Sequence, residues 1–222
     1  MTLFGALGVA FAFAVGLGKA ASPRGANMAF GLEPLVRGRS WRDKAVIGLF
    51  VASMIATSAL VGLALSTVGS PLAAELPLAP ALLGVTLAAL MVELGVSPFS
   101  APYRHWQVPR DWPARYGLPG GYALWGATLG IGVLSYVPFA SYHVLVVWMI
   151  LSGSIEAGLL LGLGYGAGRA LGSLVPAIVA SRDVGRGMET ASWALRNTSV
   201  NKGLQLALLF ALCIGGLLAA TG

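Results

Sequence analysis

Few side chains inside the long apolar stretches of this 222-residue chain could do chemistry, and Arg169 is the most informative of them. It falls near the middle of its stretch, where a charge costs roughly 3 kcal/mol and needs protein or water beside it. Glu93, in an earlier apolar stretch, is the expected partner. The arginine is either structural, in an ion pair or reaching toward lipid headgroups, or part of a site for an anion or a proton. Both residues are candidate substrate-binding residues.

A second polar group surrounds Pro138. Proline lacks an amide hydrogen and clashes with the preceding turn, so this residue predicts a break in its helix. A broken helix frees backbone groups and dipole ends of the kind that transporters use for binding. We therefore expect a substrate site near Ser135, Pro138, Ser141 and His143, with Arg169 favouring an anionic group.

Other reactive residue types favour structural roles. His143 is expected to be a hydrogen-bonded packing residue, because a metal site needs several ligands and the only other histidine, His105, belongs to a distant loop. Cys213, the only cysteine, lies in an apolar stretch and should behave as a small hydrophobe. Lys19 ends the first apolar stretch, where we expect it to reach toward the membrane surface. We expect no enzymatic activity, no metal and no cofactor.

The elements that position these residues are predicted to be transmembrane helices. Hydrophobic residues make up 57% of the chain and charged residues 10%, against about 25% charged in soluble domains. A bilayer core needs about 20 apolar residues per helix. Six stretches qualify: 2–21, 45–68, 77–96, 120–137 (running on to about 150), 157–180 and 203–220. They do not alternate, so helices are favoured over strands, in one transmembrane domain over residues 1–222.

The basic residues predict the orientation of these spans. Lys and Arg gather in the first, third and fifth loops, at Arg24, Arg37, Arg39, Arg42, Lys44, Arg104, Arg110, Arg115, Arg182, Arg186, Arg196 and Lys202. The second and fourth loops have none. Cytoplasmic loops carry such an excess, so both termini are expected outside a bacterial-type cytoplasmic (inner) membrane. This pattern explains the net charge of +6 without a nucleic-acid partner.

The number of spans predicts an internal repeat. Three spans in each half, at about 1–110 and 111–222, force the second half to be inverted relative to the first, as in inverted-repeat transporters. Both halves open with a stretch rich in Gly and Ala, 5–18 and 121–133. The predicted fold is therefore an all-α polytopic membrane protein, with six helices in a 3+3 inverted repeat and the fourth helix broken at Pro138.

Glycines four residues apart predict a close helix contact. Gly158, Gly162 and Gly166 would form a smooth helix face that lets another helix approach closely. The face is expected to pack within the chain, or against another membrane subunit or a second copy. A dinucleotide-binding loop is excluded, because no strand precedes these glycines.

The stretch 126–171 carries a family resemblance. Gly-Ile-Gly-Val-Leu-Ser-Tyr-Val-Pro-Phe-Ala at 130–140, Leu-Ser-Gly at 151–153 and Gly-Tyr-Gly-Ala-Gly-Arg-Ala-Leu at 164–171 resemble the second half of the cytochrome c biogenesis (CcdA)/DsbD-type transmembrane family. That family belongs to the LysE-like superfamily. The resemblance implies an inverted repeat of three helices, with the first and fourth broken at a proline.

The chain departs from that family at its redox residues. The electron carriers place a cysteine beside each helix-breaking proline, whereas here Phe139 follows Pro138 and Arg24 follows Pro23. The resemblance therefore implies the helical scaffold of the family but not its thiol–disulfide electron relay. The expected function is the movement of a small solute or ion, such as an anion, through a site at the broken helix. The alternative is a non-catalytic membrane subunit that scaffolds or anchors a complex through the glycine face and the aromatic, basic third loop.

Overall fold

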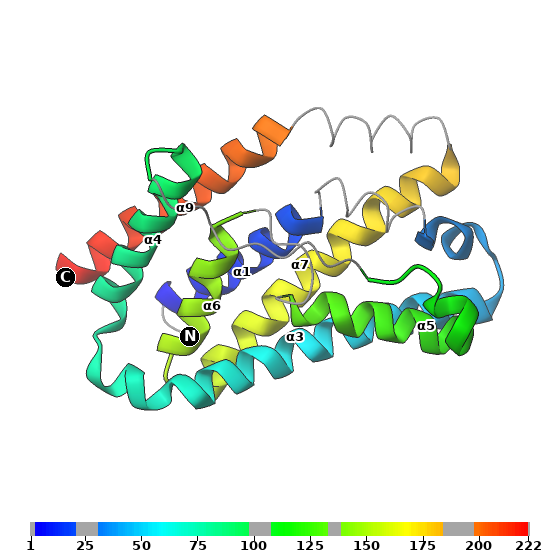
Figure 1. The fold of residues 1–222 in the computed structure, drawn as a ribbon, viewed down its shortest axis with the longest axis horizontal. Coiled ribbons are helices and arrows are strands. Elements are labelled where there is room, and N and C mark those ends of the chain that lie inside the picture. Colours follow the sequence, from blue (N-terminus) through cyan, green and yellow to red (C-terminus); the bar gives the residue numbers. More distant parts are fainter. Residues whose placement is uncertain (1–2, 21–30, 98–107, 133–138, 184–197, 222) are drawn as a thin grey trace.

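The computed structural model describes residues 3–20, 31–97, 108–132, 139–183 and 198–221 (Figure 1). Within these ranges all regular structure is helical, which confirms the all-α class. The helices are α1 (Leu3–Ala20), α3 (Trp41–Glu75), α4 (Leu78–Leu94), α5 (Trp112–Ile131), α6 (Ser141–Leu151), α7 (Ile155–Arg182) and α9 (Thr198–Thr221). A further short helical segment covers residues 31–37.

Two helices, α3 and α7, are long and apolar enough to cross a membrane. At about 1.5 Å per residue, the 35 residues of α3 span roughly 50 Å, more than the ~30 Å bilayer core. Shorter apolar helical stretches occur at Gly5–Lys19, Leu78–Leu94, Ser141–Leu151 and Lys202–Gly215. Large apolar side chains point outward, among them Val68, which is 81% exposed. These features favour a membrane protein.

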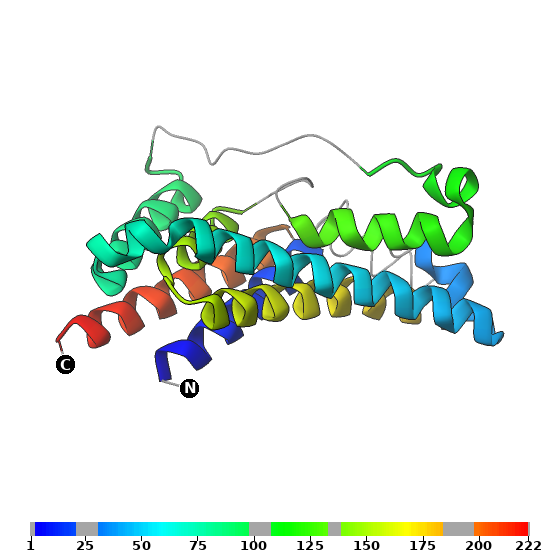
Figure 2. The same cartoon turned by 90° about the horizontal axis from the view of Figure 1, so that it is seen from below.

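Helix α7 lies between α1 and α3 (Figures 1 and 2). On its other side α3 packs against α5, and α6 packs against α3 and α4. Helices α4 and α9 pair with each other at the edge of the bundle. The two long helices therefore form the middle of the molecule, and the remaining helices pack around them.

Glycines allow α7 to touch both of its neighbours. A Cβ atom on Gly162 would overlap the Ser58 carbonyl oxygen of α3, and one on Gly166 would lie 2.9 Å from the Ile55 Cα atom. On the opposite side, a Cβ atom on Gly168 would overlap the Phe13 carbonyl oxygen of α1. The predicted close packing is confirmed. Because α3 of the same chain covers the face formed by Gly158, Gly162 and Gly166, that face is not open to a second chain.

The buried apolar side chains form two clusters that share α7. The first lies among α1, α4, α6, α7 and α9 and includes Phe11, Leu90, Leu145, Trp148, Leu161 and Leu209. The second joins the 31–37 segment to α3, α5 and α7 and includes Leu32, Phe50, Met54, Trp125 and Ala177. The middle of α7 lies between these two clusters.

The apolar run from Gly120 to Ile150 is interrupted, as predicted. Helix α5 ends at Ile131, and Gly132 has a φ of 72°, a conformation that glycine adopts without steric cost. Helix α6 begins at Ser141. Pro138, to which the break was attributed, lies in 133–138, outside the described residues.

The start of α5 differs from the sequence prediction. The predicted span begins at Gly120, but the helix begins at Trp112. Gly117, with φ 73° and ψ 161°, bends the chain there. A Cβ atom on Gly121 would overlap the backbone of Pro113, so the first turn folds back onto the helix that follows. A helical turn before Gly117 thus precedes the predicted span and is counted as part of α5.

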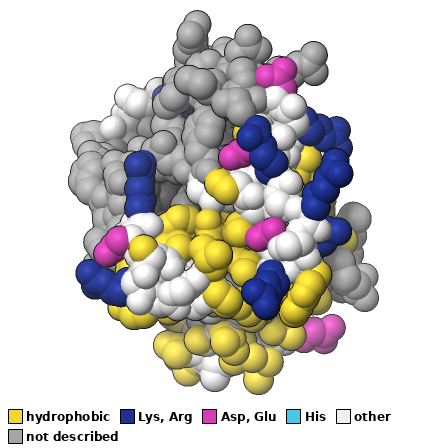
Figure 3. All heavy atoms as spheres, turned by 90° about the vertical axis from the view of Figure 1, so that its right-hand side faces the viewer, with side chains coloured by type: hydrophobic (Ala, Val, Ile, Leu, Met, Phe, Trp, Pro, Cys, Tyr) yellow, Lys and Arg dark blue, Asp and Glu magenta, His cyan; other side chains and the backbone are white. Residues whose placement is uncertain are grey.

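Basic residues gather at one end of the molecule, on the right in Figure 1. The starts of α3 and α5, the end of α7 and the 31–37 segment meet there, and they carry Arg37, Arg39, Arg42, Lys44, Arg110, Arg115 and Arg182. Figure 3 looks onto this end and shows Lys and Arg side chains around an apolar centre.

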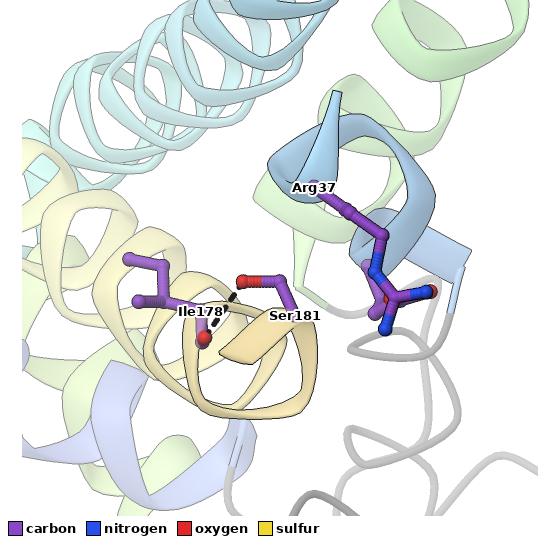
Figure 4. Close-up of polar contacts among 4 residues, drawn as sticks. Arg37, Ile178 and Ser181 are labelled. Atoms are coloured by element: carbon purple, nitrogen blue, oxygen red, sulfur yellow. Dashed lines mark hydrogen bonds and ion pairs between the residues drawn. The ribbon is translucent and has the colours of Figure 1, made fainter. Parts of the chain in front are cut away.

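The 31–37 segment lies beside the last turns of α7 at this end (Figure 4). Arg37 Nε lies 3.1 Å from Glu33 Oε1, and Ser181 Oγ donates to the Ile178 carbonyl oxygen at 2.8 Å. The described part of the predicted first loop therefore lies beside the end of α7.

Candidate functional site

The end of α5 lies beside the midpoint of α3. Ser58, the central residue of α3, has its hydroxyl 2.9 Å from the Gly130 carbonyl oxygen of α5 and 2.8 Å from the Met54 carbonyl oxygen of its own helix. The Thr57 hydroxyl likewise lies 3.0 Å from the Ala127 carbonyl oxygen and 2.8 Å from the Ser53 carbonyl oxygen. Carbonyl groups at the end of a helix lack amide partners further along the chain. The hydroxyl groups of α3 therefore hold the end of α5 at the centre of the molecule.

Lys19 caps the same helix end from α1. Its side chain is only 3% exposed, and Nζ donates to the Gly132 carbonyl oxygen at 2.7 Å. Nζ also lies 4.0 Å from the centre of the Tyr142 ring, whose hydroxyl donates to the Ile131 carbonyl oxygen at 3.3 Å. The negative end of a helix dipole and an aromatic face both stabilise a cation. The expectation that Lys19 reaches the membrane surface is wrong, because α1 ends inside the protein.

Arg169 is buried near the same place, on α7. It is 6% exposed, and Nη1 donates to the Tyr165 hydroxyl oxygen at 2.8 Å. Lys19 Nζ lies 5.9 Å from the Tyr165 ring, so this tyrosine contacts both cations. Lys19 and Arg169 therefore place two basic side chains around one tyrosine. The interpretation of Arg169 as a residue that reaches the headgroups is therefore wrong.

Glu93 caps the other side of the break. Its carboxylate, on α4, is 9% exposed, and Oε1 accepts a hydrogen bond from the Ala140 amide at 2.5 Å. A carboxylate at the start of a helix is favoured by the helix dipole. The ion pairs within the described ranges join Arg37 to Glu33 and Arg115 to Asp111. Glu93 thus binds the amino end of α6, and the ion pairs among the described residues do not join it to Arg169.

The remaining predicted residues divide into two groups. Ser141 and His143 lie in the first turn of α6, where Ser141 is buried and the His143 ring meets the Tyr142 ring edge-on at 6.1 Å. Ser135 and Pro138 lie outside the described residues. The predicted residues that can be placed therefore surround the break.

Sequence reasoning missed Lys19 as a site residue, and the sequence around it carries no signal that would have identified it.

Fold and site together define an all-helical protein with two helices long enough to cross a membrane and buried charges at both ends of an interrupted helix. No family model, curated protein or solved structure matches this chain.

Proposed function

We propose that this chain is a six-span membrane transporter that moves a small anion past the interruption between α5 and α6. The observation that carries the proposal is the burial of two cations, Lys19 and Arg169, beside the midpoints of α3 and α7. Intramembrane ionisable residues are costly and mark substrate or ion pathways by default. A small anion near both cations would offset their mutual repulsion, which gives the site its preference for negative charge.

The helix pairing supports the 3+3 inverted repeat. In the predicted repeat, α1 corresponds to α5 and α6 together, α3 corresponds to α7, and α4 corresponds to α9. The contact between α1 and α7 then corresponds to the contact between α5 and α3, and both contacts are extensive. The α3–α7 and α4–α9 pairs map onto themselves. Such a correspondence is the pattern of a pseudo-two-fold axis between two repeats, where transporters place their sites. It fits a cysteine-free relative of the CcdA/DsbD-type scaffold.

The basic end of the molecule supports the proposed orientation. Except for Lys202 in the first turns of α9, the described Lys and Arg residues of the predicted first, third and fifth loops lie at one end, whereas α1 begins and α9 ends toward the other (Figures 1 and 2). With the basic end in the cytoplasm, both termini are outside an inner membrane. The alternative role as a scaffolding subunit has less support, since α3 covers the glycine face that would have bound a partner.

Flux measurements with purified protein in liposomes test the proposal. Chloride, phosphate, sulfate and small carboxylates are offered one at a time, and empty liposomes give the background. We expect at least one anion to enter, and Arg169→Gln to lower its flux about tenfold, equivalent to ~1.4 kcal/mol of lost stabilisation. Arg115→Gln, at an exposed ion pair, is the matched control and should keep the wild-type flux. Background flux for every anion, with another polypeptide co-purifying stoichiometrically, would instead favour the subunit role.

A further inference from the structure

Each end of the helix interruption is held by a buried charge from another helix, with the sign that suits that end. The Lys19 ammonium of α1 lies on the Gly132 carbonyl oxygen, at the negative end of α5. The Glu93 carboxylate of α4 lies on the Ala140 amide, at the positive end of α6. In transporters with interrupted helices, these are the ends at which free cations and anionic groups bind. In this protein the Lys19 and Glu93 side chains occupy these two positions.

The surroundings of Lys19 resemble a cation site more than an ion pair. Its ammonium donates to the Gly132 carbonyl oxygen and makes cation–π contacts with the rings of Tyr142 and Tyr165. Within the described ranges, no carboxylate lies within ion-pair distance of it. Helix-end carbonyls and aromatic faces are the groups that stabilise a cation without neutralising it. The same groups could receive a free alkali ion or a small ammonium ion.

We propose that the carboxyl end of α5 is a monovalent-cation site whose built-in occupant is the Lys19 ammonium. If the chain moves an anion as proposed above, the site has a consequence for transport. No free sodium or potassium ion is needed at this position, because Lys19 supplies the positive charge. The site itself is a property of the folded protein. A stability measurement therefore tests it whether or not the chain moves an anion.

The experiment empties the site and offers free cations. Lys19→Ala is purified in detergent, and its apparent melting temperature is measured in sodium, methylammonium or N-methylglucamine chloride at constant ionic strength. We expect sodium or methylammonium to raise that temperature by about 3 °C or more over the bulky N-methylglucamine ion, as mass action on one site requires. Wild type and Lys19→Met, in which a side chain fills the space, should not respond.

Equal melting temperatures for Lys19→Ala in all three salts would overturn the proposal, as would an equal response in the wild type. If Lys19→Ala does not fold, the proposal is tested by comparing Lys19→Gln with Lys19→Arg. Both side chains fill the site and keep donor groups, but only arginine keeps the positive charge. The proposal expects Lys19→Arg to retain a near-wild-type melting temperature and Lys19→Gln to lose several degrees. A Lys19→Gln protein as stable as the wild type would show that the positive charge is not what the site holds.

Discussion

Gly62 of α3 and Gly158 of α7 face each other so closely that neither position has room for a side chain. A Cβ atom on Gly158 would lie 2.5 Å from the Gly62 carbonyl oxygen, and one on Gly62 would overlap the Gly158 carbonyl oxygen. The two long helices therefore meet backbone to backbone. Such contacts replace the hydrophobic driving force that is absent between helices in lipid.

This contact predicts that Gly158→Ala destabilises the protein. The added methyl group must push two backbones apart, and overpacking of this kind costs about 1–3 kcal/mol. Apparent melting temperature in detergent reports the loss. Gly48→Ala is the control, because a Cβ atom on Gly48 of α3 would meet nothing within 4 Å. Alanine there should be neutral or slightly stabilising, since it favours the helix. Equal losses for both variants would contradict the packing argument.

The hydroxyl groups that hold α5 give a second prediction. Thr57→Val keeps the shape of the side chain but removes a hydroxyl that reaches the Ala127 carbonyl oxygen of α5 as well as the Ser53 carbonyl oxygen of its own helix. We expect a loss of about 0.6–1.7 kcal/mol, the range for interhelical hydrogen bonds in membranes. Thr67→Val is the matched control, because the exposed Thr67 hydroxyl donates only within its own helix, to Leu63. Urea or thermal unfolding of the two variants should separate them.

The role of Glu93 as a helix cap gives a third prediction. Glu93→Ala removes the carboxylate that accepts from the Ala140 amide, and an unsatisfied buried donor costs about 1–3 kcal/mol. Glu93→Gln keeps an acceptor oxygen and should lose less. Glu75→Gln, at the exposed end of α3, is the control and should stay within about 0.5 kcal/mol of wild type. If Glu93 instead paired with Arg169, then Glu93→Gln would lower the anion flux to the same extent as Arg169→Gln.

Orientation in the membrane can be tested with single cysteines. Replacing Cys213 by alanine removes the chain's only native thiol. Arg42→Cys lies at the basic end, and Ser152→Cys lies in the turn between α6 and α7, at the far end of the bundle. An impermeant maleimide added to intact cells should label Ser152→Cys, whereas Arg42→Cys should react only after the membrane is opened. The reverse result would invert the proposed topology.

The helices themselves could be predicted from the sequence because long apolar runs set their positions. Predicted spans 2–21 and 157–180 match α1 and α7 to within two residues at each end. Helix α3 extends further at both ends than 45–68. Ser40 caps its start by accepting from the Asp43 amide at 3.1 Å, and the helix continues through Pro71. Such ends depend on local caps and packing, which hydropathy does not register.

The charges at the site could be located but not paired from the sequence. Arg169 and Glu93 are conspicuous within apolar runs, yet which atoms they meet depends on where each helix stops. Lys19 was misread for the same reason. A lysine at the end of an apolar run looks the same whether the helix ends at the membrane surface or inside the protein. Only the position of Gly132 beside it distinguishes the two.

The glycine contacts on both sides of α7 also limit how the molecule can deform. Helices α1, α3 and α7 touch at the level of carbonyl oxygens and Cα atoms, so they cannot slide past one another by exchanging rotamers. We therefore expect these three helices to move together as one rigid body. The α4–α9 pair makes far fewer contacts with those three helices, so we expect it to move more easily. A transport cycle that exposed Lys19 and Arg169 first to one side of the membrane and then to the other would therefore move α4 and α9 relative to α1, α3 and α7.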